Sequence, residues 1–352
     1  MTRPCRVSPV LIAGAAAGAA IGAVATLCLT GIGIRRPVSH PDPARSVDDA
    51  WQRVEALRSA EAGEIHPAGH TALLTPTDPA TGTPTVVLMH GLTMTPDQFG
   101  WIGSVIRDAG YRVLLPLMPD HGRCDGSTEA LADVRAEDLT AWADSTVDIA
   151  AGFGGPVWVM GLSAGGLMAA WCARVRPEVT RVAAIAPFTA PAGYPWAAVR
   201  IAARLEGMLP KTMHYWDDEL KTEANLSPYG YSGFPIRGGS AYMRISEALY
   251  DGRLAQQPNL EHATLVLNDC DDAVSEFRAR ELFRACFYQT ASGYEEITLP
   301  ASLGWEHDFI DPWLDPRPNP QAVLEILLGA LGIEGPKATA AIEVYQGGTG
   351  GY

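Results

Sequence analysis

The 352-residue chain is 47% hydrophobic and 19% charged, which supplies enough apolar material for a large core and excludes wholesale disorder. Its formal net charge is −14, and the sequence contains no run of Lys and Arg. A nucleic-acid-binding protein would carry a basic patch or stripe, so we expect no nucleic-acid partner.

The first 36 residues are predicted to be a membrane anchor or a signal peptide. No charged residue occurs between positions 7 and 34, and this run exceeds the roughly 20 apolar residues that a helix needs to cross a bilayer. Three glycines within it are spaced four residues apart, as in close-packed membrane helices: Gly14, Gly18 and Gly22. The alternative is a cleaved signal peptide, since Ala-Val-Ala at 23–25 offers a small-x-small cleavage site. We therefore expect a membrane-anchored, extracytoplasmic domain, or a domain secreted after cleavage.

The rest of the chain alternates between short β-branched runs and helical patterns, which is typical of an α/β fold with a mostly parallel sheet flanked by helices. After a linker and the start of the folded part at 37–60, this alternation covers 61–188 and 261–334. Strands are predicted at 85–89, 111–117, 157–160, 181–185, 264–267 and 295–299. Helices are predicted at 97–109, 137–152, 164–175, 275–287 and 320–331. Residues 189–260 are predicted to form a cap inserted between two strands, and 335–352 a flexible Gly-rich tail.

The strand predicted at 85–89 ends in His90-Gly91-Leu92-Thr93. In hydrolases that transfer acyl groups, the loop after this strand donates one of the two amides that stabilise the oxyanion. By position, that donor is the backbone N–H of Leu92. His90 lies at the strand end, where we expect it to orient the loop and not to act as a base.

The clearest motif is Gly161-Leu162-Ser163-Ala164-Gly165, which follows an apolar strand and precedes a helical pattern. A sharp turn between strand and helix exposes the serine hydroxyl at the end of a sheet. Both glycines are needed because a side chain at either position would clash in so tight a turn. The first amides of the helix face the developing oxyanion. We predict Ser163 as the nucleophile and the N–H of Ala164 as the second oxyanion donor.

Three segments carry a family resemblance: HGLTMTPDQF at 90–99, LPLMPDHG at 115–122 and GLSAG at 161–165. Together they resemble the monoacylglycerol lipase and carboxylesterase branch of the α/β-hydrolase superfamily, over roughly residues 70–332. The resemblance implies an α/β-hydrolase fold with a cap, and a serine esterase that acts on a small-molecule or lipid ester through a Ser-His-Asp triad and an acyl-enzyme, without metal or organic cofactor. Acyl transfer or peptide hydrolysis at the same triad, or a catalytically silent domain that binds a lipid or a partner, are the alternatives.

The order nucleophile, acid, histidine in this family selects the remaining triad members. Of eight histidines, only His307 lies beyond the strand predicted at 264–267, and it is therefore predicted to be the general base. The stretch NDCDDAV at 268–274 resembles the family pattern His-Gly-x-x-Asp-x-Val. Superimposing its valine on Val274 places the acid at Asp272, with Asp271 as the competitor and Asp269 as a more distant candidate.

The six cysteines contain no Cys-x-x-Cys pair and no zinc-site spacing. Four of them lie in the predicted folded part. An extracytoplasmic location would permit a disulfide, and Cys270 and Cys286 are the pair nearest in sequence. The alternative is that all four are unpaired thiols, and Cys172 is expected in the core.

Overall fold

The computed structural model describes residues 36–333, with gaps at 127, 217–229, 252–253, 255–258 and 313. The predicted anchor or signal segment, apart from Arg36, and the predicted Gly-rich tail lie outside the described residues. Within the described ranges, none of the helices has both the length and the apolar character needed to cross a bilayer.

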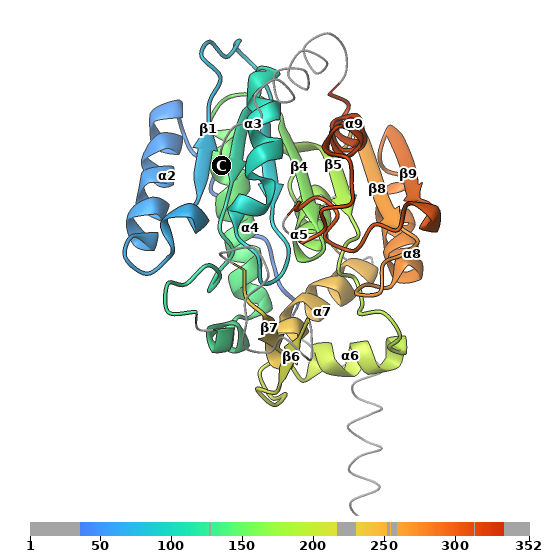
Figure 1. The fold of residues 1–352 in the computed structure, drawn as a ribbon. Coiled ribbons are helices and arrows are strands. Elements are labelled where there is room, and N and C mark those ends of the chain that lie inside the picture. The colour runs from blue at the N-terminus through green and yellow to red at the C-terminus, as the bar shows by residue number, and fades with distance from the viewer. Residues whose placement is uncertain are drawn as a thin grey trace, which may run out of the picture.

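A seven-stranded sheet in the order β1-β3-β2-β4-β5-β8-β9 forms the centre of the molecule (Figure 1). Its strands are β1 (Ala72–Leu74), β2 (Thr85–Met89), β3 (Arg112–Leu115), β4 (Val157–Leu162), β5 (Val179–Ile185), β8 (His262–Asn268) and β9 (Gly293–Leu299). Only β1 pairs in an antiparallel way, and all other neighbours are parallel. Every residue of β2 and β4 is buried, as expected for parallel strands that are covered on both faces.

Helices cover both faces of this sheet, which confirms the predicted α/β fold class. They are α2 (Val47–Glu61), α3 (Gly100–Asp108), α4 (Ala136–Ala151), α5 (Ala164–Val175), α8 (Glu276–Phe287) and α9 (Pro320–Leu331). In Figure 1, α3 and α9 lie in front of the sheet, and α4 and α5 lie behind it. Local sequence fixes several helix ends: in α9, Asn319 caps the first turn, Pro320 occupies the first position and Gly332 ends the helix with a φ of 69°.

The segment between β5 and β8 contains α6 (Trp196–Arg204), β6 (Met213–Tyr215), β7 (Gly233–Pro235) and α7 (Ile236–Tyr250). Strands β6 and β7 form a separate antiparallel pair. These elements gather at the lower end of the molecule in Figure 1, and we refer to them as the cap. Because the cap follows β5 directly, it lies at the carboxyl edge of the sheet.

Residues 36–46, which we call the strap, run along α4 before α2 begins. The Asp144 carboxylate accepts a hydrogen bond from Ser39 Oγ at 2.6 Å, and that of Asp148 accepts one from the Asp42 N–H at 2.9 Å. The strap then leads into α2, which occupies much of the stretch predicted as a linker and start of the folded part. Ala50 and Val54 on this helix are fully buried, so α2 packs on the core.

Candidate active site

Ser163 occupies a strained turn between β4 and α5. Its φ of 55° and ψ of −114° lie in a region that residues with a side chain rarely adopt. Two backbone hydrogen bonds hold the turn against the neighbouring strand: the Ser163 N–H donates to the Ile185 carbonyl and the Phe188 N–H donates to the Ser163 carbonyl, both at 2.9 Å. The side chain is 8% exposed. The turn therefore presents one hydroxyl at the carboxyl edge of the sheet.

The two glycines of the motif are required by close backbone contacts. A Cβ at Gly161 would lie 2.3 Å from the backbone of Gly165, and a Cβ at Gly165 would lie 2.0 Å from the carbonyl oxygen of Met89. No side chain fits at either distance. Because Gly165 packs on the end of β2, the first turn of α5 lies beside the loop that follows β2.

His90 orients that loop through both ring nitrogens. Its Nε2 accepts a hydrogen bond from the Met118 N–H at 3.0 Å, so Nδ1 carries the proton and donates to the Gly91 carbonyl at 2.8 Å. Burial, and then the nearby His121, hold the pKa of His90 well below its ordinary value, so the ring is neutral. The Gly91 carbonyl and the Leu92 N–H belong to the same peptide unit. Fixing the carbonyl therefore also fixes the direction of the Leu92 N–H.

The two predicted oxyanion donors flank this turn. Within the described part of the chain, neither the Leu92 N–H nor the Ala164 N–H donates a hydrogen bond to a protein acceptor. Buried N–H groups in proteins are almost always paired. Two such amides without an acceptor, one on each side of a strained serine, are suited to receive an oxygen atom of a ligand.

His307 pairs with Asp271, which corrects the prediction of Asp272. The Nδ1 of His307 lies 2.6 Å from Asp271 Oδ2, and the two side chains are 12% and 2% exposed. The other oxygen, Oδ1, accepts the N–H groups of Ala273 at 2.9 Å and Val274 at 3.1 Å. This turn directs the Asp271 carboxylate toward the imidazole and leaves Asp272 exposed. The structure thus places Asp271, the competitor named from the sequence, against His307 and leaves the predicted Asp272 without a hydrogen bond to His307 among the described residues.

The charge around His307 favours the protonated ring. Burial alone lowers the pKa of His307, but the hydrogen bond to Asp271 and the charges of Asp271, Asp308 and Asp272 outweigh it and raise the pKa to about 9. With Nδ1 on Asp271, Nε2 is the nitrogen left for a reacting group.

Asn268 holds the loop that carries His307, a role that the sequence interpretation missed. Its side-chain amide donates to the carbonyls of Trp305 at 2.9 Å and Glu306 at 3.0 Å. Asn268 stands where the family pattern has histidine, and this departure is what ties the end of β8 to the histidine loop. The only sign of this role in the sequence is that asparagine replaces the histidine of the family pattern.

The topology brings the three predicted triad positions to one edge of the sheet. Ser163 follows β4, the acid follows β8 and His307 follows β9, at the carboxyl ends of parallel strands. In the described residues, no hydrogen bond joins Ser163 Oγ to His307. Hydrogen bonds between a catalytic serine and histidine are often long in the absence of substrate.

The cap is attached to the loop beside Leu92. The Tyr231 N–H donates to the Thr93 carbonyl at 2.8 Å, and the indole N–H of Trp216 donates to Thr93 Oγ1 at 2.9 Å. The Tyr231 hydroxyl also donates to the Asp120 carbonyl at 3.1 Å. His121 is fully buried next to His90. The turn after β3 thus supports both the cap and the loop after β2.

The four described cysteines are all free, so the disulfide considered for Cys270 and Cys286 is absent. Cys286 is buried on α8 and Cys270 is exposed after β8, whereas Cys172 lies in the core as expected. Among the residues that the structure describes, no group of His, Cys, Asp or Glu side chains is arranged to hold a metal ion.

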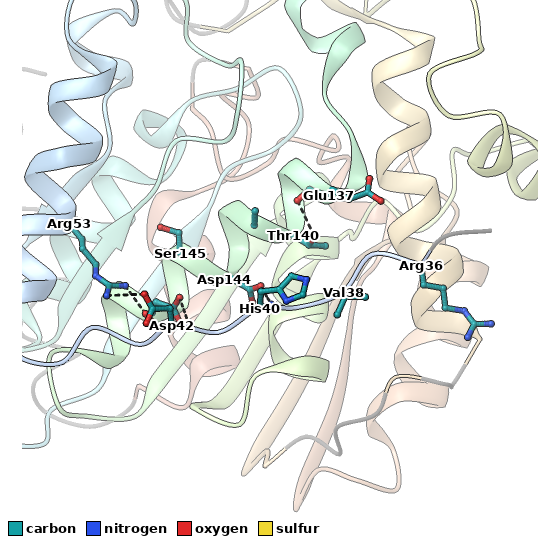
Figure 2. A pocket seen from close by; sticks show the side chains of 11 residues that line it. Arg36, Val38, His40, Asp42, Arg53, Glu137, Thr140, Asp144 and Ser145 are labelled. Carbon is teal, nitrogen blue, oxygen red and sulfur yellow. Dashed lines mark hydrogen bonds and ion pairs between the residues drawn. The ribbon is translucent and has the colours of Figure 1, made fainter. Parts of the chain in front are cut away.

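A cavity of about 350 Å³ lies between the strap, α2 and α4 (Figure 2). Charged and polar side chains line it, among them Arg36, His40, Arg53, Glu137 and Asp144. None of the residues around Ser163 or His307 contributes to its walls. The cavity is therefore separate from the candidate active site.

Comparison with known proteins agrees with the observed fold. A sequence profile of the alpha/beta hydrolase family matches residues 86–330. One of two metagenome-derived lipolytic enzymes has a similar structure, with a TM-score of 0.52 and 19% identity, covering 76% of this chain and 99% of that one. The monoacylglycerol lipase of Paleococcus ferrophilus has a TM-score of 0.51 and 20% identity, covering 74% of this chain and 98% of that one. A soluble variant of monoglyceride lipase from Saccharomyces cerevisiae has a TM-score of 0.54 and 14% identity, covering 75% of this chain and 91% of that one. A comparison with curated protein sequences finds no match.

Proposed function

The chain belongs to the alpha/beta hydrolase family, and from this premise we propose that it is a serine hydrolase that cleaves carboxylic esters. The observation that carries the proposal is the strained turn at Ser163, with a φ of 55°, between two amides that have no protein acceptor among the described residues. A strained residue of this kind persists where the surrounding structure enforces it, which is typical of a reacting group. The lipolytic neighbours support an ester, either a simple carboxylic ester or a monoacylglycerol-like lipid, as the substrate class.

In the proposed mechanism, Nε2 of His307 takes the proton from Ser163 Oγ as the oxygen attacks the ester carbonyl. Asp271, bound to Nδ1, fixes the tautomer and stabilises the imidazolium. The N–H groups of Leu92 and Ala164 bind the oxyanion of the tetrahedral intermediate. His307 returns the proton to the departing alcohol, and a water molecule then attacks the acyl-enzyme by the same route in reverse, releasing the acid.

Replacing Ser163 tests the nucleophile. We expect Ser163→Ala to lower kcat on a p-nitrophenyl ester by at least about 10³-fold, because the hydroxyl forms the acyl-enzyme. The same variant should lose labelling by a fluorophosphonate probe. The matched control is Ser145→Ala on α4, an exposed serine in the separate cavity, which should keep both signals. Full esterase activity in the Ser163→Ala protein would exclude the proposed mechanism.

We also propose that residues 1–36 bring the domain to a membrane. The support is the uncharged stretch at 7–34, and the proposal is tested by fractionating cells that express the full chain. An anchor remains in the membrane pellet after carbonate washing. A cleaved signal peptide instead yields a shorter, extracytoplasmic product in the soluble fraction. Recovery of the full-length chain in the cytoplasm excludes both routes.

A further inference from the structure

Gln98 connects two loops that carry different parts of the candidate active site. It lies in the short helix η2 (Pro96–Phe99) and is 2% exposed. Its Oε1 accepts the Gly91 N–H at 2.8 Å, and its Nε2 donates to Asp308 Oδ1 at 3.2 Å. The first contact is with the loop after β2. The second is with the residue that follows His307, 210 positions away in the sequence.

The chemistry of the two partners fixes how the Gln98 amide is oriented. Gly91 offers an N–H, which can only donate, and Asp308 offers a carboxylate, which when ionised can only accept. Turning the amide by 180° would place the two N–H donors together and the two oxygens together. Glutamine is therefore matched to both loops at once. A side chain without both a donor and an acceptor would lose one contact.

The contact bears directly on the Leu92 amide. The Gly91 N–H is held by Gln98, and the Gly91 carbonyl is held by His90 at 2.8 Å. With both polar groups of Gly91 fixed, the peptide unit that ends in the Leu92 N–H cannot rotate freely. On the other side of Gln98, Asp308 is the direct neighbour of His307.

We propose that Gln98 is a positioning residue that aligns the Leu92 oxyanion amide with the general base His307. This inference rests on the proposed function, because both groups act on one reacting carbonyl. The oxyanion amide must lie about 3 Å from the oxygen of the transition state, whereas the base must reach the Ser163 hydroxyl. Gln98 sets the spacing between these two groups through a single side chain.

Exchanging the amide of Gln98 and the carboxylate of Asp308 tests the proposal, because neither substitution changes the number of non-hydrogen atoms. In Gln98→Glu, the new carboxylate faces Asp308, and we expect kcat to fall about 10- to 100-fold with KM within about threefold, since a displaced oxyanion donor affects the transition state. Combining it with Asp308→Asn replaces the repulsion by an amide that donates to the new carboxylate. The Gly91 N–H keeps its acceptor. We therefore expect the double variant to recover most of kcat.

The control is Gln52→Glu, which introduces the same charge at an exposed position on α2 and should leave kcat unchanged. Gln98→Met, of similar length but with neither polar group, should lose kcat in the same range, and here Asp308→Asn should give no rescue. If Gln98→Glu alone does not fold, Gln98→Met and the double variant decide the outcome.

Three results would overturn the inference: an unchanged kcat in the folded Gln98 variants, a loss confined to KM, or a double variant no better than Gln98→Glu. If the activity of the wild-type protein depends on Ser163, any of these three results would leave the proposed function intact. A wild-type protein without such activity would instead reject the proposed function, and this inference with it.

Discussion

Asp271 uses one carboxylate for two tasks. Oδ1 accepts two backbone N–H groups and Oδ2 binds His307 at 2.6 Å, so the acid is held rigidly by its own turn. Asp272, one residue further, is exposed and acts on His307 only through its charge.

The two neighbours should therefore respond very differently to the same substitution. We expect Asp271→Asn to reduce kcat by about 10³- to 10⁴-fold, because an amide supports the wrong tautomer of His307. Asp272→Asn should change kcat by less than about threefold, since the charge is exposed to solvent. Steady-state kinetics on one ester measures kcat for both variants. Equal losses in both variants would contradict the assignment of the acid.

The pKa of His307 predicts the pH dependence of the reaction. Burial lowers this pKa, but Asp271 and the other carboxylates raise it to about 9. The base acts when neutral, so the active fraction increases as the pH rises through that value. We expect kcat/KM to increase with pH up to about 9 and then to level off. Asp272→Asn should move the midpoint to lower pH, whereas a profile already flat from pH 6 would contradict the raised pKa.

Local stereochemistry decides which residues of the site could be predicted from the sequence. The turn at Ser163 was predictable because a tight strand-to-helix turn demands glycine at fixed positions on each side. The pairing of Asp271 with His307 was not predictable, since the choice between two adjacent aspartates depends on how the loop after β8 folds. Gln98 was not predictable either, because its role exists only when residues 210 positions apart meet.

The strand and helices that meet at the Gly161–Gly165 motif leave no room for an added side chain, whereas α9 leaves room for one at Gly329. A Cβ at Gly165 would lie 2.0 Å from the Met89 carbonyl oxygen, while a Cβ at Gly329 on α9 would meet nothing within 4 Å. Gly329 lies in the last turn of α9 and does not have a positive φ, so alanine is favoured there over glycine.

This contrast gives a paired prediction for stability. We expect Gly165→Ala to destabilise the protein by more than about 3 kcal/mol or to prevent folding, as backbone atoms cannot yield. Gly329→Ala should stabilise it by up to about 1 kcal/mol. Urea unfolding measures both. A Gly165→Ala protein as stable as the wild type would show that α5 can move away from β2.

At this scale the strands and helices of the sheet layers were mostly predictable, whereas the short strand β1, the weakly patterned helix α2 and the cap helix α7 were not. The strand predicted at 85–89 matches β2, because a continuous apolar run is typical of a buried parallel strand. Strand β1 has three residues, too few for a pattern. Helix α2 has only a narrow apolar face, with Ala50 and Val54 buried, so its sequence resembled a linker.

Across the whole molecule, Arg176 joins segments that are distant in sequence. It is 1% exposed and pairs with Asp144 at 3.2 Å, Asp148 at 2.5 Å and Glu178 at 3.1 Å. The same two aspartates of α4 bind the strap. A buried cation thus neutralises the carboxylates that hold residues 36–46 on the folded part.

Removing that cation should affect the entire fold. We expect Arg176→Met to lower the free energy of unfolding by about 3–5 kcal/mol, since it leaves buried carboxylates without a partner. The control is Arg107→Met, whose half-exposed pair with Asp108 contributes less than about 1 kcal/mol. Denaturant unfolding monitored by circular dichroism compares the two. Equal stability of both variants would show that the strap and its aspartates are not coupled to the core.

The two ends of the described chain lie at opposite edges of the sheet. The strap begins at Arg36, whose guanidinium pairs with Asp251 at the end of cap helix α7. At the other end, the Leu331 carbonyl accepts a hydrogen bond from Arg181 at 3.0 Å, near the start of β5 and hence at the amino edge of the sheet. A surface or fusion partner attached through the C-terminal side would leave the cap facing outward. Attachment next to Arg36 would instead hold the molecule beside its cap, so the two ends of the described residues present the site in opposite ways.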